Sequence, residues 1–197
     1  DQWVRSTLVS PAPSIPDLEA ISSLLDSTFS KLSSADQVQP VSHIAVPLLQ
    51  LLLSQPLSSN SSVLSEVLSC ISALFSVVLI APDALSVILQ RIFQPLSSPN
   101  VDISKEIRTL RRHSCSLLVK LGTKFPNTLL PSFGFVSSEV SRLNSAGLLS
   151  KMEYCTLLGG LSIVSNKFGN HDRQAMCLAE ILTPVLDTLR SLETHYS

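Results

Sequence analysis

The sequence predicts an all-α protein in which antiparallel helix pairs stack side by side as a solenoid. Its 197 residues are 45% hydrophobic but only 5% aromatic, with 6 glycines. This composition suits helices that pack on helices and argues against a β-sandwich or a nucleotide-binding α/β fold. Apolar residues recur at three- and four-residue spacing, and no stretch alternates with period two for long enough to form a sheet. The helical segments also begin at a nearly constant interval.

Prolines and polar clusters divide the chain into eight segments with helical periodicity. The first segment opens with Pro16 and Asp17, which are favoured in the first turn of a helix. The third follows Asn60, a good N-cap residue. Proline interrupts the sixth segment at Pro131. The expected helices span residues 16–33, 40–54, 62–80, 83–96, 102–124, 127–143, 147–168 and 171–193.

The odd-numbered helices begin near residues 16, 62, 104 and 148, a period of about 44 residues that is typical of HEAT and armadillo units. One such unit cannot bury its apolar stripe alone, so neighbouring units share a continuous core. We therefore predict a right-handed α-solenoid of HEAT-type helix pairs, in preference to a compact helical bundle. The chain has no initiator Met. We interpret residues 1–197 as a single solenoid segment excised from a longer chain.

The register of the helix pairs follows from the segment 102–124. The second helix of a HEAT unit commonly reads Asp, then Val-Arg, then Ala, and here Asp102 precedes the run LRRHSC. Arg112 and Cys115 fall at the Arg and Ala places of that pattern. The odd-numbered helices are therefore expected to be second helices, which line the concave side. The complete repeats are then 40–80, 83–124 and 127–168.

Charge is distributed unevenly along a chain whose net charge is −1. Residues 1–100 carry 3 Lys/Arg against 7 Asp/Glu, residues 101–173 carry 10 against 5, and residues 174–197 carry 1 against 3. The net charges are thus −4, +5 and −2, which sum to −1. A basic central region predicts contact with a polyanion or with an acidic protein surface. A solvated helix face without a partner is the alternative.

The segment 102–124 concentrates this positive charge on one side of a helix. A helical wheel places Lys105, Arg108, Arg112 and Ser116 together, with Lys120 at the edge of the group. The opposite side is apolar and comprises Ile107, Leu110, Leu117, Leu118 and Leu121. Guanidinium groups at this spacing can bind successive phosphate oxygens, and the serine hydroxyl adds a donor. For Arg112, an ion pair with an acidic residue of a neighbouring repeat is an alternative.

Catalytic and metal-binding patterns are absent from the sequence. The four cysteines, Cys70, Cys115, Cys155 and Cys177, have no zinc or disulfide spacing, and we interpret them as reduced, buried residues of an intracellular protein. The histidines lie in separate segments without a nucleophile at motif spacing, and we expect them to be structural or exposed. We expect Gly159 and Gly160 to allow close helix packing or a kink. The charge-free stretch at 67–82 is too short for a membrane span. We expect no enzyme, cofactor or metal site.

Several stretches resemble one family of nuclear transport receptors. They are RRHSCS at 111–116, FPNTLLPSF at 125–133, LLSKMEYC at 148–155 and IVSNKFGNHDRQ at 163–174, with PDLEAISSLLDS at 16–27 and LSCISALF at 68–75. Together they are similar to the middle of the exportin-5/Hasty family of karyopherins, in the importin-β superfamily. The resemblance covers most of the chain and is strongest from 110 to 185.

The resemblance implies a segment of a nuclear export receptor. That family binds precursor microRNA hairpins, or double-stranded RNA with a 3′ overhang, together with RanGTP on the concave side of a HEAT solenoid. It contacts nucleoporins through the full-length protein and shuttles between nucleus and cytoplasm, and GTP enters only through Ran. A basic groove suits such cargo because A-form RNA hides its base edges in a deep groove. The alternative function is a HEAT scaffold that mediates only protein–protein interaction.

The resemblance also implies particular RNA-binding residues. Arg112 and Ser116 match positions on an inner helix that contact the overhang. Lys151 and Tyr154 match a second contacting turn. The family carries an amide at the place of Lys151 and a lysine at the place of Tyr154, so the positive charge has moved by one helical turn.

Overall fold

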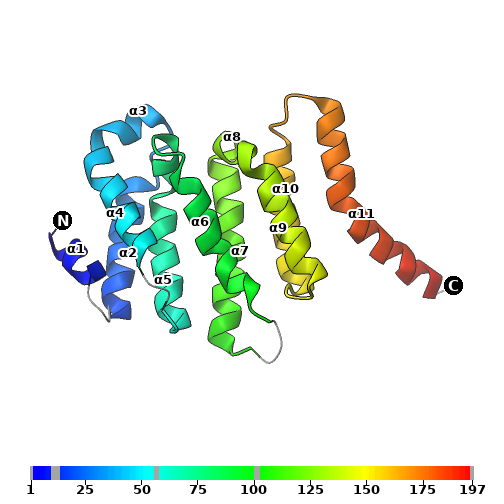
Figure 1. Ribbon diagram of the computed structural model, residues 1–197, viewed down its shortest axis with the longest axis horizontal. Helices are drawn as coiled ribbons and strands as arrows, with labels where there is room; N and C mark the ends of the chain where they lie inside the picture. The colour runs from blue at the N-terminus through cyan, green and yellow to red at the C-terminus, as the bar shows by residue number, and fades with distance from the viewer. Residues whose placement is uncertain (1, 10–13, 56–57, 100–102, 196–197) are drawn as a thin grey trace.

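The computed structural model describes residues 2–9, 14–55, 58–99 and 103–195, and every regular element in these ranges is a helix (Figure 1). The prediction of an all-α protein is therefore confirmed for this part of the chain. The α-helices are α1 (Gln2–Val9), α2 (Ile15–Phe29), α3 (Ala35–Val38), α4 (Ser42–Ser54), α5 (Ser61–Ala73), α6 (Ala84–Phe93), α7 (Lys105–Lys124), α8 (Pro126–Leu129), α9 (Phe133–Ser145), α10 (Lys151–Ser165) and α11 (His171–His195). Four 3₁₀ turns join them, namely η1 (Gln39–Val41), η2 (Phe75–Leu79), η3 (Gln94–Ser97) and η4 (Leu130–Ser132).

The helices form two layers in chain order (Figure 1). In one layer α2, α5, α7 and α10 pack successively against one another. In the other layer, α4 packs against α5, α6 against α7 and α9 against α10. The arrangement is compatible with an α-solenoid. None of the helices within the described ranges is long and apolar enough to cross a membrane.

Each helix of the α2–α10 layer begins with a capping side chain. Ser14, Asn60, Ser104 and Ser150 all accept hydrogen bonds from backbone N–H groups of the first turn. At Ser150 the cap is reciprocal, because the carboxylate of Glu153 accepts from the Ser150 N–H at 2.7 Å. These caps satisfy N–H groups that would otherwise lack partners and fix where the helices start. The four aligned starts bring the N-terminal ends to one edge of the layer (Figure 1).

The expected segments each contain a helix, but their ends differ from the prediction. The segment expected at 62–80 is α-helical only to Ala73 and continues as η2. Pro131 interrupts the segment expected at 127–143, as predicted, by imposing η4. The helix expected from residue 102 begins at Lys105, while Asp102 lies outside the described residues. Helix α1 was not predicted from the sequence.

One hydrophobic core extends from α1 to α11. Helical periodicity predicts Leu18, Ile21, Leu25, Phe29 and Leu32 in the core; the first four are buried in α2, and Leu32, beyond its end, is half-buried. Helical periodicity predicts Met176, Leu182 and Leu186 of α11 in the core, but they are 74%, 46% and 46% exposed, so this prediction is wrong. The reason is that α11 packs principally against α10, which covers only one side of it. The side chain of Leu189, also expected in the core, lies outside the described residues.

Candidate nucleic-acid interface

Helix α7 presents one polar and one buried face, largely as the helical wheel predicts. Lys105, Arg108, Arg112 and Ser116 are all exposed, and we call these four residues the α7 ridge. The buried face comprises Leu110, Leu117, Leu118 and Leu121. Ile107, predicted on the apolar side, is 37% exposed, because it lies in the first turn beyond the end of the core. The ridge therefore places two guanidiniums, an ammonium and a hydroxyl on one accessible surface.

The arginine of α7 that pairs with a carboxylate of another helix is Arg111, and among the described residues Arg112 does not form the alternative ion pair. The Arg111 side chain is fully buried, and its Nε and Nη2 donate to the two carboxylate oxygens of Glu153 at 2.8 and 3.1 Å. Its Nη1 donates to the carbonyls of Pro95 and Ser98, each at 3.0 Å, and Nη2 also donates to the Leu148 carbonyl. Adjacent residues on a helix point about 100° apart, so only one of the two arginines can enter the interface with α10.

The Arg111–Glu153 pair is satisfied on both sides. Burial favours the neutral form of Glu153, but hydrogen bonds from Arg111 and Ser150 favour the charged form and hold the pKa of Glu153 below its ordinary value. The carboxylate is therefore ionised at neutral pH and balances the buried guanidinium. A bidentate pair of this kind also fixes geometry. It joins α7 to the start of α10 and to the segment that precedes α7.

Two glycines allow α7 and α10 to approach closely. A Cβ atom added to Gly122 of α7 would lie 2.9 Å from Cγ2 of Val164 of α10, and one added to Gly160 would lie 3.3 Å from Cγ2 of Val119. Gly160 thus serves the close packing predicted for the Gly159-Gly160 pair. Gly159 itself faces open space. The α7–α10 seam, defined by Arg111, Glu153, Gly122 and Gly160, is consequently both close-packed and ion-paired.

A groove of about 240 Å³ runs beside this seam, and Arg112 and Ser116 of the α7 ridge form part of one wall. Its lining residues are Arg112, Cys115, Ser116, Met152, Glu153 and Thr156. The Ser116 hydroxyl donates to the Arg112 carbonyl at 3.0 Å. In the described part of the chain no carboxylate lies within ion-pair distance of the Arg112 guanidinium. Arg112 is thus available to an anion that enters the groove.

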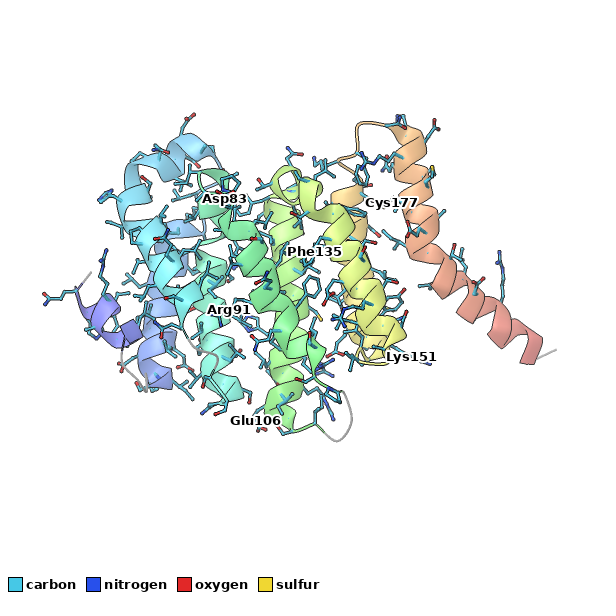
Figure 2. All side chains as sticks on the ribbon, viewed as in Figure 1. Asp83, Arg91, Glu106, Phe135, Lys151 and Cys177 are labelled. Carbon is cyan, nitrogen blue, oxygen red and sulfur yellow. The ribbon has the colours of Figure 1, made fainter. Side chains whose placement is uncertain are left out.

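Lys151 and Tyr154 do not line the groove beside Arg112. Lys151 is the first residue of α10 and is exposed, at the same edge of the layer as Glu106 of α7 (Figure 2). Tyr154 is half-buried and packs against the core, and this burial raises its pKa. The α10 wall is formed by Met152 and Thr156 instead, which sequence reasoning missed. The spacing of Met152 and Thr156, four residues apart, shows that they share a face of α10. The sequence does not show which face of α10 is turned toward α7.

Two further grooves lie between α2, α5 and α7, and they are acidic as well as basic. Lys105 lines one of about 370 Å³ together with Glu19, Glu66 and Glu106. The other, of about 540 Å³, has carboxylates and serine hydroxyls facing Lys120 of α7, and Ser116 also borders it. Burial and the nearby Glu19 raise the pKa of Glu66. Arg108 is exposed but lines none of the three grooves.

The chain resembles known proteins along almost its full length. The model of the Exportin-5 family matches residues 16–196. Human exportin-5 is 30% identical over 191 residues, which cover 93% of this chain and 16% of the relative. Mouse exportin-5 is 34% identical over 190 residues, covering 92% and 16%, and exportin-5 of Dictyostelium discoideum is 23% identical over 141 residues, covering 69% and 12%. The chain belongs to the exportin-5 family.

The exportin-5 match includes the features that build the interface. The matched residues begin at the second residue of α2 and include α5, α7 and α10, the α7–α10 seam and every lining residue of the three grooves except Ile15. Helix α1 lies before the match. This chain spans 16% of the length of the human and mouse relatives. The family assignment made from sequence motifs is confirmed.

One histidine and two cysteines of the predicted structural set lie in buried or partly buried surroundings. His113 lies with Nδ1 2.9 Å from the Ser65 hydroxyl, and burial together with Lys120 lowers its pKa, so its ring is neutral at pH 7. This matches the predicted structural role. Cys70 and Cys115 are buried, and burial raises the pKa of each thiol to about 12.

The cysteine prediction needs one correction. Cys177 is buried as expected, but Cys155 is exposed. Cys155 follows Tyr154 in α10, and Tyr154 is the residue that packs toward the core at this turn. A step of about 100° around the helix then leaves Cys155 outside the core.

Proposed function

We propose that this chain is a segment of a nuclear export receptor whose α7 ridge contributes to a groove for structured RNA. The family assignment supports the receptor role, and a transport receptor is not an enzyme. The observation that supports the RNA role is the contrast between two adjacent arginines, one buried and one exposed. Arg111 is buried in the seam, and this leaves Arg112 exposed beside an open groove without a carboxylate partner in the described residues.

The chemistry of the α7 ridge suits a phosphate backbone. Arg108 and Arg112 lie four residues apart on one face, about 6 Å along the helix axis. Guanidinium forks can bind phosphate oxygens in pairs, and Ser116 adds a hydroxyl donor. Sequence-independent binding to A-form RNA requires contacts to phosphates, 2′-hydroxyls and duplex ends rather than base pockets. Arg112 and Ser116 are proposed to meet the 3′ overhang, and Lys105 and Arg108 to meet the duplex stem.

Lys151 and Tyr154 are proposed as a separate RNA contact. Both lie in the first turn of α10, on a different side of that helix from the Arg112 groove. The exposed ammonium of Lys151 can approach a phosphate without rearrangement. Tyr154 is half-buried against the core, so only part of its side chain is open to RNA.

The wider assembly is part of the same proposal. The helix pairs are HEAT repeats of a right-handed superhelix, with α2, α5, α7 and α10 as second helices on the concave side. The successive packing of these four helices supports it. The full-length receptor binds hairpin RNA together with RanGTP, contacts nucleoporins and shuttles between nucleus and cytoplasm. GTP enters only through Ran, and this segment needs no cofactor.

A second function, protein binding alone, is favoured by the other half of the same face. Glu19, Asp26 and Glu66 line the grooves between α2, α5 and α7. Carboxylates repel phosphates, so that half suits a basic protein surface. On this alternative the α7 ridge would meet an acidic protein.

The test is a charge reversal in the full-length receptor. Arg108→Glu combined with Arg112→Glu is expected to weaken binding of a hairpin RNA with a 3′ overhang in the presence of RanGTP. The slope of log affinity against log salt should also fall by about 1 for each phosphate that the receptor no longer binds. Fluorescence anisotropy across a salt series measures both effects.

The matched control is Lys167→Glu, which makes the same kind of charge change beyond the C-terminal end of α10. Along the axis of α10 this position is about 16 Å from Thr156 and the groove. Unchanged RNA affinity of the double variant, with circular dichroism like that of the native receptor, rejects the RNA role of the ridge. Capture of a protein partner that survives nuclease and is abolished in the double variant would support the protein-binding alternative.

A further inference from the structure

Two lysines of α7 reach across α5 and contact α2. Lys120 Nζ lies 3.6 Å from Oδ1 of Asp26, and Lys124 Nζ donates to the carbonyl of Ser30 at 3.0 Å, across 94 residues of sequence. In a helical array of this kind each repeat ordinarily contacts only its immediate neighbours. These contacts join two helices of the α2–α10 layer between which a third helix is inserted. We call Lys120, Lys124, Asp26 and Ser30 the cross-repeat clasp.

Helix α5 is shaped to let the lysines pass. On the side of Lys120, the surface of α5 between α2 and α7 carries the short side chains of Ser69 and Ser72, and Glu66 lines the same groove about one turn before Ser69. Each serine hydroxyl donates to a carbonyl of its own helix, and the Ser72 hydroxyl also accepts from Lys120 Nζ at 3.2 Å. Near the position of Lys124, α5 is no longer α-helical, because it ends at Ala73. The aliphatic parts of the two lysine side chains can therefore pass over α5 without meeting a bulky side chain.

The partners on α2 are suited to cations. Ser30 is the C-cap residue of α2, and its carbonyl lies at the negative end of the helix dipole. Asp26 is one turn earlier on the same helix. Lys124, the second positive group, is therefore attracted by the negative end of α2 as well as by the Asp26 carboxylate. Both lysines lie in the last part of α7, so the clasp closes only the C-terminal edge of the layer.

Within the described ranges, the opposite edge of the same three helices has no such bridge. There Lys105 and Glu106 of α7 border a groove with Glu19 and Glu66. Among the described residues no ion pair joins α2 to α7 at this N-terminal edge. We infer that the clasp draws α2 and α7 together at one edge and so sets the curvature and twist of the concave wall. This inference does not depend on RNA binding.

The clasp is a conformational device because it is exposed to solvent. Lys120 is 32% exposed and Asp26 is 54% exposed. An ion pair of this kind contributes little to unfolding stability and weakens as salt screens it. Yet it acts across two helix interfaces, so small changes in its strength rotate one repeat relative to another. The wall should therefore open at its C-terminal edge when salt is raised or when the lysines are removed.

The experiment measures the distance between α2 and α7 in the full-length protein. Spin labels on ketone-bearing amino acids at Thr28 and Thr123, both exposed, report the C-terminal edge. A second pair at Ala20 and Thr109 reports the N-terminal edge. Double electron–electron resonance is expected to give a longer and broader distance for Thr28–Thr123 in Lys120→Ala/Lys124→Ala. The native protein at high salt should shift in the same direction, while the Ala20–Thr109 pair changes less.

Matched variants keep the result interpretable. Lys120→Arg/Lys124→Arg retains both charges and should keep the native distance, and Lys167→Ala should have no effect. Asp26→Asn is a milder change on the other side of the clasp and should give a partial shift. A Thr28–Thr123 distance that is identical in the native, double-alanine and Asp26→Asn proteins, and insensitive to salt, overturns the inference.

Discussion

The two junctions on either side of α7 are held by different kinds of contact. Toward α10, a fully buried Arg111 pairs with Glu153, and Gly122 and Gly160 bring the helices close together. Toward α2, the polar contacts lie at the surface, and Lys120 reaches Asp26 with both side chains partly exposed. A buried pair cannot exchange its partners for water without unfolding, whereas an exposed one can. One junction is therefore rigid and the other adjustable.

The two junctions also distinguish basic residues of α7 that make structural contacts from those that remain available to a ligand. Of the charged residues in α7, Arg111 is committed to the rigid seam and Lys120 and Lys124 to the clasp. The α7 ridge is what remains for a ligand. A count of positive charge over residues 101–173 therefore overestimates the charge that is free to meet a partner. Substitutions that disrupt one junction of α7 and leave the other intact test whether the two differ in rigidity.

The largest expected effect is that of Arg111→Ala. The change leaves the buried Glu153 carboxylate and the carbonyls of Pro95, Ser98 and Leu148 without the Arg111 donor, so it should lower the free energy of unfolding by about 3–5 kcal/mol. Urea unfolding followed by circular dichroism measures the decrease. The control is Arg111→Met/Glu153→Leu, which removes both charges and should recover much of the stability. A decrease for Arg111→Ala of under about 1 kcal/mol would show that the seam does not depend on the ion pair.

Acid should weaken the same seam in a definite pH window. The folded-state pKa of Glu153 lies below its ordinary value, which is about 4.3 for an unfolded chain. Its contribution to stability is therefore present above about pH 4 and lost as pH falls through the folded pKa. The stability difference between the native chain and Glu153→Gln should be largest at neutral pH and shrink in acid. A difference that stays constant from pH 7 to pH 3 would contradict this assignment.

Two neighbouring tests of glycine should have opposite signs. Gly122→Ala places a Cβ against Val164 in the seam, and overpacking of this kind costs about 1–3 kcal/mol. Alanine also favours the helix by about 1 kcal/mol, so the net destabilisation should be up to about 2 kcal/mol. Gly159→Ala meets nothing and should stabilise the chain by about 0.5–1 kcal/mol. Thermal melting of both variants measures the contrast, and equal shifts would mean that the seam is not close-packed.

Local patterns predicted much of this molecule, and pairings between distant residues account for the rest. Caps such as Ser150 with Glu153 and the spacing of apolar residues are properties of short stretches, so they are readable from sequence. The choice between Arg111 and Arg112 depends on a partner 42 residues away and on how α7 is rotated against α10. Sequence patterns therefore left the role of Arg112 open between a ligand and an ion pair, and they gave no role to Arg111. The exposed side chains of α11 likewise depend on which helices cover it, which periodicity cannot show.

The smallest expected effect on stability comes from the clasp. Lys120→Ala removes a partly exposed ion pair, and such pairs contribute about 0–1 kcal/mol to unfolding stability. Urea unfolding should thus place this variant within about 1 kcal/mol of the native chain, although the distance between α2 and α7 changes. Raising salt should narrow even that small difference, because screening weakens the exposed pair in the native chain. A destabilisation as large as that of Arg111→Ala would mean that both junctions of α7 are rigid and that curvature at the clasp cannot be adjusted independently of folding.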